Sequence, residues 1–197
     1  EDSLRMLAHA ERAADELGSA NIDMLVFACT ASSFVQGIDG EQQLRRQIEA
    51  AANAPAVTTS GAVIESLRAI GAEQIALYTP YPDELNHHET QFLEEHGVEA
   101  ISAHGLGIAE AVQIAAVTSH RLLGLIAAHP PPPQATAIFL SCTNLATLEV
   151  IRDIEHTYNL PVVSSNSATF FAVARRLKWP LPPSLGHISR TYSSKDF

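Results

Sequence analysis

The 197-residue sequence is poor in cysteine and in basic residues, and it has no long apolar run. It contains two cysteines, and its 12 Lys and Arg residues face 22 Asp and Glu residues, for a formal net charge of −10. Such an acidic chain does not attract nucleic acid or an anionic membrane through its overall charge. No stretch approaches the roughly 20 apolar residues of a membrane-spanning helix. We therefore expect partners other than nucleic acid or membrane.

Other absences narrow the class further. Two cysteines in a chain of this length fit a reducing, cytoplasmic compartment, although a disulfide between them is the alternative. The sequence has no Gly-x-Ser-x-Gly elbow of a serine hydrolase and no Cys/His spacing typical of zinc sites. Gly105-x-Gly107 lacks the third glycine of a dinucleotide fingerprint. With 46% apolar and 17% charged residues, the composition is that of an ordinary globular protein.

The two cysteines stand in similar surroundings. Cys29 and Cys142 each end an apolar run and each precede a threonine. Similar stretches follow them further along the chain, and these read Ala54-Pro55-Ala56-Val57-Thr58-Thr59-Ser60 and Leu160-Pro161-Val162-Val163-Ser164-Ser165-Asn166. A duplicated unit with one thiol per copy predicts a site shared between two halves.

Strand and helix patterns alternate along the chain. We expect strands over 22–28, 54–58, 74–78, 98–102, 136–140 and 161–163. We expect helices over 3–18, 41–52, 61–70, 83–96, 109–116, 119–128, 144–154 and 167–178. This alternation predicts an α/β fold with parallel sheets. Together with the duplicated unit and the resemblance described below, it implies two pseudo-symmetric parallel-sheet domains with the active site in the cleft between them.

The domain boundaries follow from the repeat. We expect a first domain of residues 1–57 plus 161–197 and a second domain of residues 58–160. Since the chain opens in a helical pattern and an α/β unit normally begins with a strand, we expect the first domain to lack its N-terminal strand here. The segment 179–197 has no clear period and is predicted to wrap over the surface.

Both cysteines are predicted to lie between a strand end and a helix N-terminus. A free thiol with a pKa of about 8.5 is mostly protonated at neutral pH, and such a position favours its thiolate. Hydroxyl, amide and backbone donors beside the two sulfurs suit a carboxylate or an enolate oxygen. These donors belong to Thr30, Ser32, Ser33, Thr143 and Asn144, whose alternative roles are helix capping and turn formation.

Four motifs occur in order along nearly the whole chain. They are Cys29-Thr30-x-Ser32, Thr79-Pro80-Tyr81 followed by Asn86, Ser141-Cys142-Thr143-Asn144-Leu145, and Pro161-Val162-Val163-Ser164-Ser165-Asn166. Together they resemble the maleate isomerase and arylmalonate decarboxylase branch of the aspartate/glutamate racemase superfamily. The resemblance implies an isomerase with no metal and no organic cofactor, acting on a small mono- or dicarboxylate. It leaves a homo-oligomer open.

The resemblance also implies residue roles. Cys29 matches the nucleophile that adds to a double bond, and Cys142 matches the proton donor and acceptor. Tyr81 matches the tyrosine that binds a substrate carboxylate. The positions that match the anion cradles are Thr30, Ser32, Thr143 and Asn144.

Several activities stay open within this resemblance. Maleate isomerases have an asparagine in the loop where this chain reads His104-Gly105-Leu106-Gly107-Ile108, and arylmalonate decarboxylases have glycine at the position of Cys29. Two thiols favour a cis–trans isomerase of the maleate type over an amino-acid or hydantoin racemase or an arylmalonate-type decarboxylase. A carboxylate-binding scaffold without catalysis is the alternative from another class.

Overall fold

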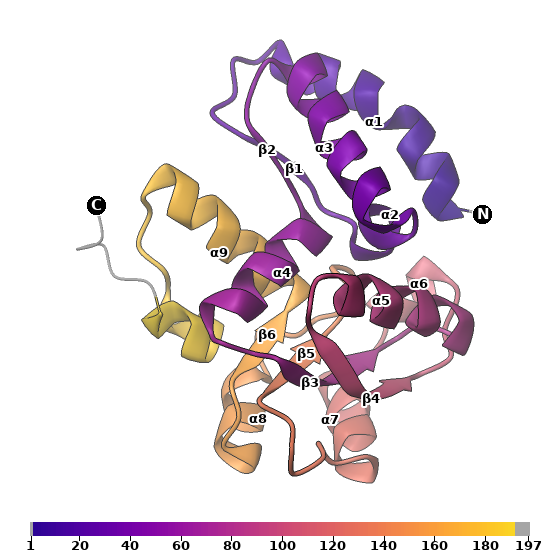
Figure 1. The fold of residues 1–197 in the computed structure, drawn as a ribbon, viewed down its shortest axis with the longest axis vertical. Helices are drawn as coiled ribbons and strands as arrows, with labels where there is room; N and C mark the ends of the chain where they lie inside the picture. The colour runs from indigo at the N-terminus through magenta and orange to yellow at the C-terminus, as the bar shows by residue number, and fades with distance from the viewer. Residues whose placement is uncertain (1, 192–197) are drawn as a thin grey trace.

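The computed structural model describes residues 2–191 and has an α/β architecture with two parallel sheets (Figure 1). In chain order its elements are α1 (Asp2–Gly18), β1 (Leu25–Phe27), α2 (Thr30–Phe34), α3 (Gly37–Ala52), β2 (Ala56–Thr58), α4 (Thr59–Ala69), β3 (Gln74–Thr79), α5 (Asp83–Glu95), β4 (Glu99–Gly105), α6 (Ala111–Ala115), α7 (Ser119–Ala128), β5 (Ala137–Leu140), α8 (Ile151–Tyr158), β6 (Val162–Ser164), α9 (Ser165–Leu177) and the 3₁₀ segment η1 (Pro183–Arg190). The predicted fold class is confirmed.

The smaller sheet pairs β1 with β2 and is covered by α1 and α3. Its apolar core is a separate cluster made of Ala10, Ala14, Leu25, Leu44, Ile48, Ala52 and Ala56. The helices approach closely at Gly18, where a Cβ atom would lie 2.4 Å from the carbonyl oxygen of Ala52. Gly18 is therefore needed for the close contact between α1 and the end of α3.

The larger sheet has the order β4-β3-β5-β6, and all of its strands are parallel. Its central strands β3 and β5 are buried along almost their whole length, as expected for strands covered on both faces. In a parallel sheet the carboxyl ends of the strands share one edge, where ligands usually bind. The chain after β5 therefore delivers Cys142 to the edge at which β3 delivers Thr79 and the residues after it.

The internal repeat is visible in backbone detail. Asn53 and Asn159 end α3 and α8 in the left-handed conformation, at φ 49° and 52°. The carbonyl of Pro55 then accepts from the backbone N–H of Leu25 in β1 at 2.8 Å, and the carbonyl of Pro161 accepts from that of Ile138 in β5 at 2.9 Å. In both copies the strand runs directly into a helix whose N-cap hydroxyl belongs to the last strand residue, Thr58 or Ser164.

A glutamate completes each copy of the repeat. The side-chain Oε1 atom of Glu49 accepts from the backbone N–H of Ala56 at 3.2 Å, and that of Glu155 accepts from Val162 at 3.1 Å. The Oε1 atom of Glu155 also accepts from the N–H of His187 in η1 at 2.8 Å, whereas Glu49 pairs with Arg45 on its own helix at 3.0 Å. The second copy of the repeat therefore holds the C-terminal segment, and the first does not.

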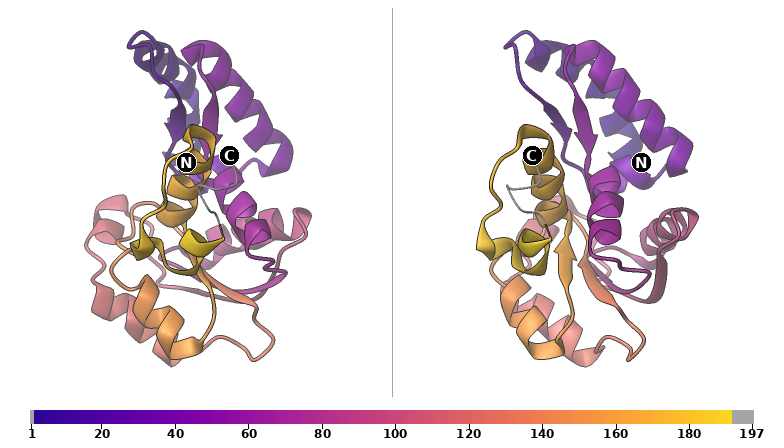
Figure 2. Two further views of the ribbon diagram at one scale, coloured as in Figure 1. Left: turned by 90° about the vertical axis from the view of Figure 1, so that its left-hand side faces the viewer. Right: turned by 60° about the vertical axis from the view of Figure 1, so that its left-hand side comes forward.

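Helices α4 and α9 pack against each other between the two sheets (Figures 1 and 2). The strands expected over 54–58 and 161–163 lead into α4 and α9, and both were expected in the first domain. This is wrong for the second of these strands. Val162–Ser164 pairs with β5 in the four-stranded sheet, because Ile138, Phe139 and Leu140 are its register partners. The boundaries 1–57 plus 161–197 and 58–160 otherwise stay a prediction.

Two local expectations also differ from the structure. The helix expected from Asn144 begins at Ile151 instead, and turns fill the segment between Cys142 and Val150. Between the expected strand 22–28 and the expected helix 41–52, the structure has the short helix α2. The predicted wrapping segment forms η1 over α8, and its residues 192–197 lie outside the described part. No helix within residues 2–191 is long and apolar enough to cross a membrane.

Because Glu155 bonds to η1 and Glu49 does not, we predict different losses of stability when the two glutamates are replaced. Glu155→Ala leaves two backbone N–H groups without their acceptor and should lower the free energy of unfolding by about 1–3 kcal/mol. Glu49→Ala leaves one such group and should cost less, while Glu155→Gln keeps an acceptor oxygen and should cost least. Urea unfolding followed by circular dichroism measures all three. Equal losses in the free energy of unfolding for the two alanine variants would contradict a stabilising role of the bond between Glu155 and η1.

Candidate functional site

The loops that carry Cys29 and Cys142 are hydrogen-bonded to each other. The hydroxyl of Thr143 donates to the carbonyl of Ala28 at 3.1 Å. The Oγ atom of Ser165, at the start of α9, accepts from the hydroxyl of Thr30 at 2.9 Å and from the backbone N–H of Cys142 at 3.0 Å. Ser165 is fully buried. The structure thus brings the two cysteine loops to one place.

Both cysteines are free thiols, so the disulfide considered above does not form. Cys29 is half-buried and stands at the N-cap of α2 in an extended conformation. Its thiol donates to the hydroxyl of Ser32 at 3.2 Å, and that hydroxyl donates to the Sδ atom of Met6 at 3.7 Å. Helix α1 therefore reaches the Cys29 side of the site through Met6.

Cys142 has a backbone conformation that L residues rarely adopt, with φ at 94°. Such strain costs on the order of 1–3 kcal/mol and persists only where surrounding contacts hold it. Here the N–H of Cys142 is held by Ser165, and its carbonyl accepts from Leu145 at 3.2 Å. The expected position at a helix N-terminus is wrong, because a turn follows Cys142. A backbone donor is still supplied, since Asn144 makes a backbone hydrogen bond to the sulfur.

Burial dominates the electrostatics of Cys142 and Tyr81. Desolvation raises the pKa of the Cys142 thiol, and the hydrogen bonds from Tyr81 and the Asn144 backbone partly oppose this rise. Desolvation likewise raises the pKa of Tyr81 well above its usual range, with the neighbouring Cys142 as the second cause. At neutral pH the pair is therefore a thiol and a phenol joined by a hydrogen bond.

The backbone around Tyr81 is held by hydrogen bonds to Thr79 and to the loop that contains Gly107. The carbonyl of Tyr81 accepts from Gly107 at 3.2 Å, and its N–H donates to the hydroxyl of Thr79 at 2.9 Å. That hydroxyl donates to the side chain of Asn86 at 2.6 Å. A Cβ atom on Gly105 would lie 2.2 Å from the Tyr81 carbonyl oxygen, so only glycine fits there. The loop that differs from maleate isomerases thus supports Tyr81 through its backbone.

Several side chains expected to bind the substrate's carboxylate are hydrogen-bonded within the protein instead. The hydroxyl of Thr30 is bonded to Ser165, and that of Thr143 is bonded to Ala28. The side-chain amide of Asn144 donates to the carbonyl of Ala111 at 2.6 Å. The substrate-binding roles of Thr30, Ser32, Tyr81, Thr143 and Asn144 stay predictions.

Three residues near the cysteines were not among the expected site residues. Ser165 could have been found from the repeat, because it matches Thr59 in the first copy. Ser141 directly precedes Cys142 and is fully buried. Glu89 lies on the helix expected over 83–96 and was not singled out as a site residue. Its spacing from Asn86 and Phe92 puts all three on one buried helix face, which is the signal that could have found it.

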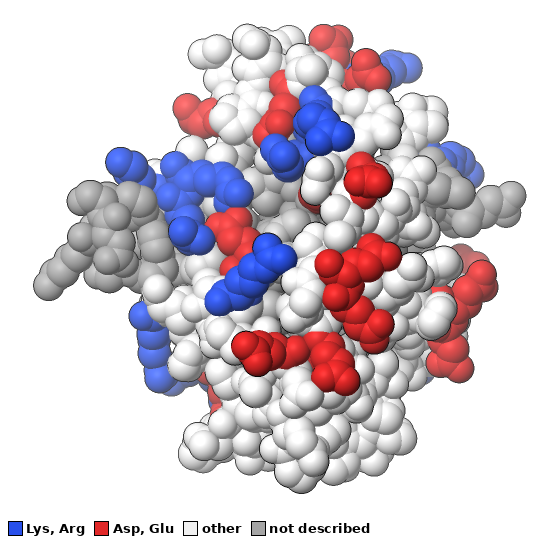
Figure 3. Space-filling model, in the orientation of Figure 1, with Lys and Arg blue, Asp and Glu red and all other residues white. Residues whose placement is uncertain are grey.

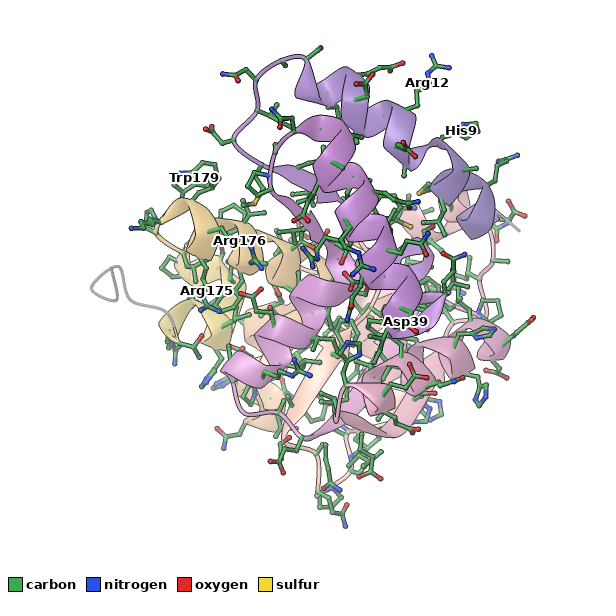
Figure 4. The ribbon with its side chains drawn as sticks, turned by 45° about the horizontal axis from the view of Figure 1, so that its top comes forward. His9, Arg12, Asp39, Arg175, Arg176 and Trp179 are labelled. Atoms are coloured by element: carbon green, nitrogen blue, oxygen red, sulfur yellow. The ribbon has the colours of Figure 1, made fainter. Side chains whose placement is uncertain are left out.

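Basic and acidic side chains gather on different sides of one face of the molecule. Figure 3 shows Lys and Arg gathered on the side of α9 and acidic side chains on the side of α5. Figure 4 shows Arg175 and Arg176 on α9 and, at the opposite periphery, His9 and Arg12 on α1. Arg175 and Arg176 pair with Glu65. Within residues 2–191, no three His, Cys, Asp or Glu side chains come together to hold a metal ion.

Known proteins resemble this chain over most of its length. The maleate isomerase of Pseudomonas putida is 27% identical over 192 residues, which cover 94% of this chain and 77% of that protein. The arylmalonate decarboxylase of Bordetella bronchiseptica is 34% identical over 147 residues, which cover 74% of this chain and 61% of that protein.

The fold is also found among solved structures. One is a variant of the Nocardia farcinica maleate cis–trans isomerase with a covalently bound succinylcysteine intermediate. It superposes with a TM-score of 0.92 at 22% identity, and the match covers 97% of this chain and 80% of that one. The sequence profile of the arylmalonate decarboxylase family matches residues 4–187. The chain therefore belongs to the arylmalonate decarboxylase family, a family of enzymes that includes the maleate isomerases.

Proposed function

We propose that this protein is a cofactor-independent cis–trans isomerase of a small dicarboxylate of the maleate type. The observation that carries the proposal is the hydrogen-bonded contact between the two cysteine loops, through Thr143 to Ala28 and through Ser165. A reaction that needs a nucleophile on one side of an alkene and a proton source beside it suits two thiols held in this way. The two thiols are also coupled, because a charge on Cys29 raises the pKa of Cys142.

The reaction balances with these two thiols alone. The Cys29 thiolate forms a C–S bond with one alkene carbon, while Cys142 gives its proton to the other carbon. Rotation then occurs about the resulting C–C single bond. Cys142 takes a proton back from that carbon, the C–S bond breaks, and the trans product leaves with both sulfurs restored. The succinylcysteine seen in the Nocardia enzyme is an adduct of this type.

No described Lys or Arg residue is among the groups that act on Cys142, so the donors beside this thiol for the substrate's negative charge are dipoles. Backbone N–H groups after Cys29 and Cys142 and the Tyr81 hydroxyl are the donors of this kind beside the sulfurs. Several short donor contacts to an oxyanion stabilise developing charge without a cation. These donors also fit the enolate that forms as the thiolate adds.

A second candidate is decarboxylation of an arylmalonate-type substrate. It is favoured by the hydrogen-bonded pair of Tyr81 and Cys142, which would suffice to protonate an enolate after loss of CO₂. The 34% identity with the Bordetella enzyme points the same way. Cys29 is what favours isomerisation, because decarboxylation does not require a second thiol.

Proton NMR in heavy water tests the function directly. The protein is incubated with maleate, D- and L-aspartate, glutamate and an arylmalonate, with both thiols reduced. We expect conversion of maleate to its trans isomer. Deuteration at an α-carbon would identify a racemase, and loss of CO₂ from the arylmalonate would identify a decarboxylase. No change in any substrate would contradict catalysis on these acids and favour a carboxylate-binding role.

Replacement of either cysteine should stop turnover without unfolding the protein. Loss of a nucleophile or of a positioned proton donor costs about 10²–10⁴-fold or more in rate. We expect Cys29→Ser and Cys142→Ser to fall to this level while circular dichroism spectra stay unchanged. Mass spectrometry separates their roles, because only Cys142→Ser keeps the nucleophile and should gain the mass of one substrate on Cys29. Near-normal turnover in either variant would rule out the two-thiol reaction.

Tyr81→Phe should lower kcat/KM by destabilising the transition state, with a smaller effect on the stability of the fold. Loss of one hydrogen bond from a phenol to a charged group costs about 1–3 kcal/mol, which is roughly 5–150-fold in kcat/KM. Tyr78→Phe is the matched control, because its hydroxyl donates to the carbonyl of His129 at 2.6 Å and not to the site. Equal losses of kcat/KM in the two variants would remove Tyr81 from the mechanism.

A further inference from the structure

Glu89 on α5 is a buried carboxyl group that the reaction above does not use. It is 2% exposed, and its Oε1 atom accepts from the hydroxyl of Ser141 at 2.5 Å. Its Oε2 atom is buried without a hydrogen-bond partner. An ionised carboxylate in such a place is costly, whereas a protonated carboxyl carries no charge to desolvate. Burial accordingly raises the pKa of Glu89 to about 8.

Hydrogen bonds lead from this carboxyl to the thiol of Cys142. Ser141, bonded to Glu89, is also hydrogen-bonded to the side chain of Tyr81. Tyr81 in turn is hydrogen-bonded to Cys142. The series Glu89, Ser141, Tyr81, Cys142 thus joins a buried carboxyl to the proposed proton-bearing thiol through two hydroxyl groups, each of which can both donate and accept.

The titratable groups that bear on this series come from a few elements. The pKa of Cys142 is shifted by Tyr81, Cys29 and Glu89, and the pKa of Tyr81 is shifted by Cys142 and Glu89. Helix α2, which packs on α5, has no titratable side chain.

The other elements that pack on α5 also carry titratable groups, none of which is among the causes that shift the pKa of Glu89. From α3, Glu41 is buried and bonded to Thr58, while Asp39, Arg45, Arg46 and Glu49 share that helix. From β4, Glu99 accepts from Gln74, and the His104 ring stacks on His129. On α5 itself, the side chains of Asp83, Glu84, His87, His88, Glu94 and Glu95 accompany Glu89.

We propose that Glu89 is a positioning residue for Cys142: its buried carboxyl, at the far end of the series through Ser141 and Tyr81, makes Cys142 hold its proton more tightly when the carboxyl is charged. This inference rests on the proposed role of Cys142 as the proton-bearing thiol. Glu89 touches no reacting atom in the proposed reaction and acts through the hydroxyl groups between them.

The sign of the coupling follows from like-charge repulsion. Below a pH of about 8 the carboxyl is neutral and does not oppose a transient thiolate at Cys142. Above it, an ionised Glu89 raises the pKa of Cys142 and keeps the thiol protonated. Two acids coupled in this way lose their protons in two steps that belong to the pair. Removal of the carboxyl charge must therefore let Cys142 lose its proton at lower pH.

The Glu89→Gln variant tests this, because it is neutral at every pH and close in shape to a protonated carboxyl. We measure the rate of alkylation of Cys142 against pH by mass spectrometry in the Cys29→Ala background, where Cys142 is the one remaining thiol. We expect the midpoint of this profile to fall by about one pH unit in Glu89→Gln. Superimposable profiles in folded proteins would overturn the proposal, and a purely structural Glu89 would lower stability without moving the midpoint.

Ser141→Ala provides a second variant that keeps the carboxyl. Its hydroxyl lowers the pKa of Glu89, so its removal should keep the carboxyl protonated to higher pH. Infrared spectra follow the protonated carboxyl directly: we expect its band at neutral pH, its absence in Glu89→Gln, and its persistence to higher pH in Ser141→Ala. Absence of the band at neutral pH from the unaltered protein would overturn the proposal. Neither measurement uses a substrate, so its failure is distinct from a failure of the proposed isomerase activity.

Discussion

The hydroxyl group of Ser165 is the contact on which the arrangement of the site depends. Its oxygen accepts from Thr30, beside Cys29, and from the backbone of Cys142, so one buried atom bonds to both cysteine loops. Ser165 also begins α9, whose capping box between Ser164 and Ser167 fixes the helix start. Since α9 packs on α4 between the sheets, the position of this oxygen is set by the packing of the two halves. The geometry of the thiols is therefore coupled to the internal repeat.

Much of this arrangement could be predicted from the sequence, because it depends on local signals. Apolar runs before Cys29 and Cys142, and the paired stretches after Pro55 and Pro161, indicated parallel strands, a repeat and two thiols at strand ends. Motifs around Tyr81 and Ser165 indicated the family. These signals are set by residues close in the chain, and tertiary contacts did not override them.

The errors come from contacts between distant segments. The strand after Pro161 pairs with β5, and nothing in its own sequence distinguishes this neighbour from one in the other sheet. The apolar spacing from Leu145 to Ile154 fits a helix, but the strained backbone of Cys142 and the bond from Asn144 to Ala111 hold its first part in turns. Glu89 was not expected in the site, since burial of a carboxyl requires a partner from a distant segment, here Ser141 directly after β5.

The chemistry beside Cys142 is that of a site made of weak acids. Glu89, Tyr81 and Cys142 each carry a proton at neutral pH because burial penalises the charged form, and no described cation is among the causes that act on them. A second negative charge in the same place is opposed by the first. The proposed dicarboxylate would add charge of the same sign, which would strengthen the tendency of Cys142 to keep its proton until a carbanion is available to receive it. An ordinary thiol is already mostly protonated at neutral pH, and the surroundings of Cys142 make it hold its proton more tightly still.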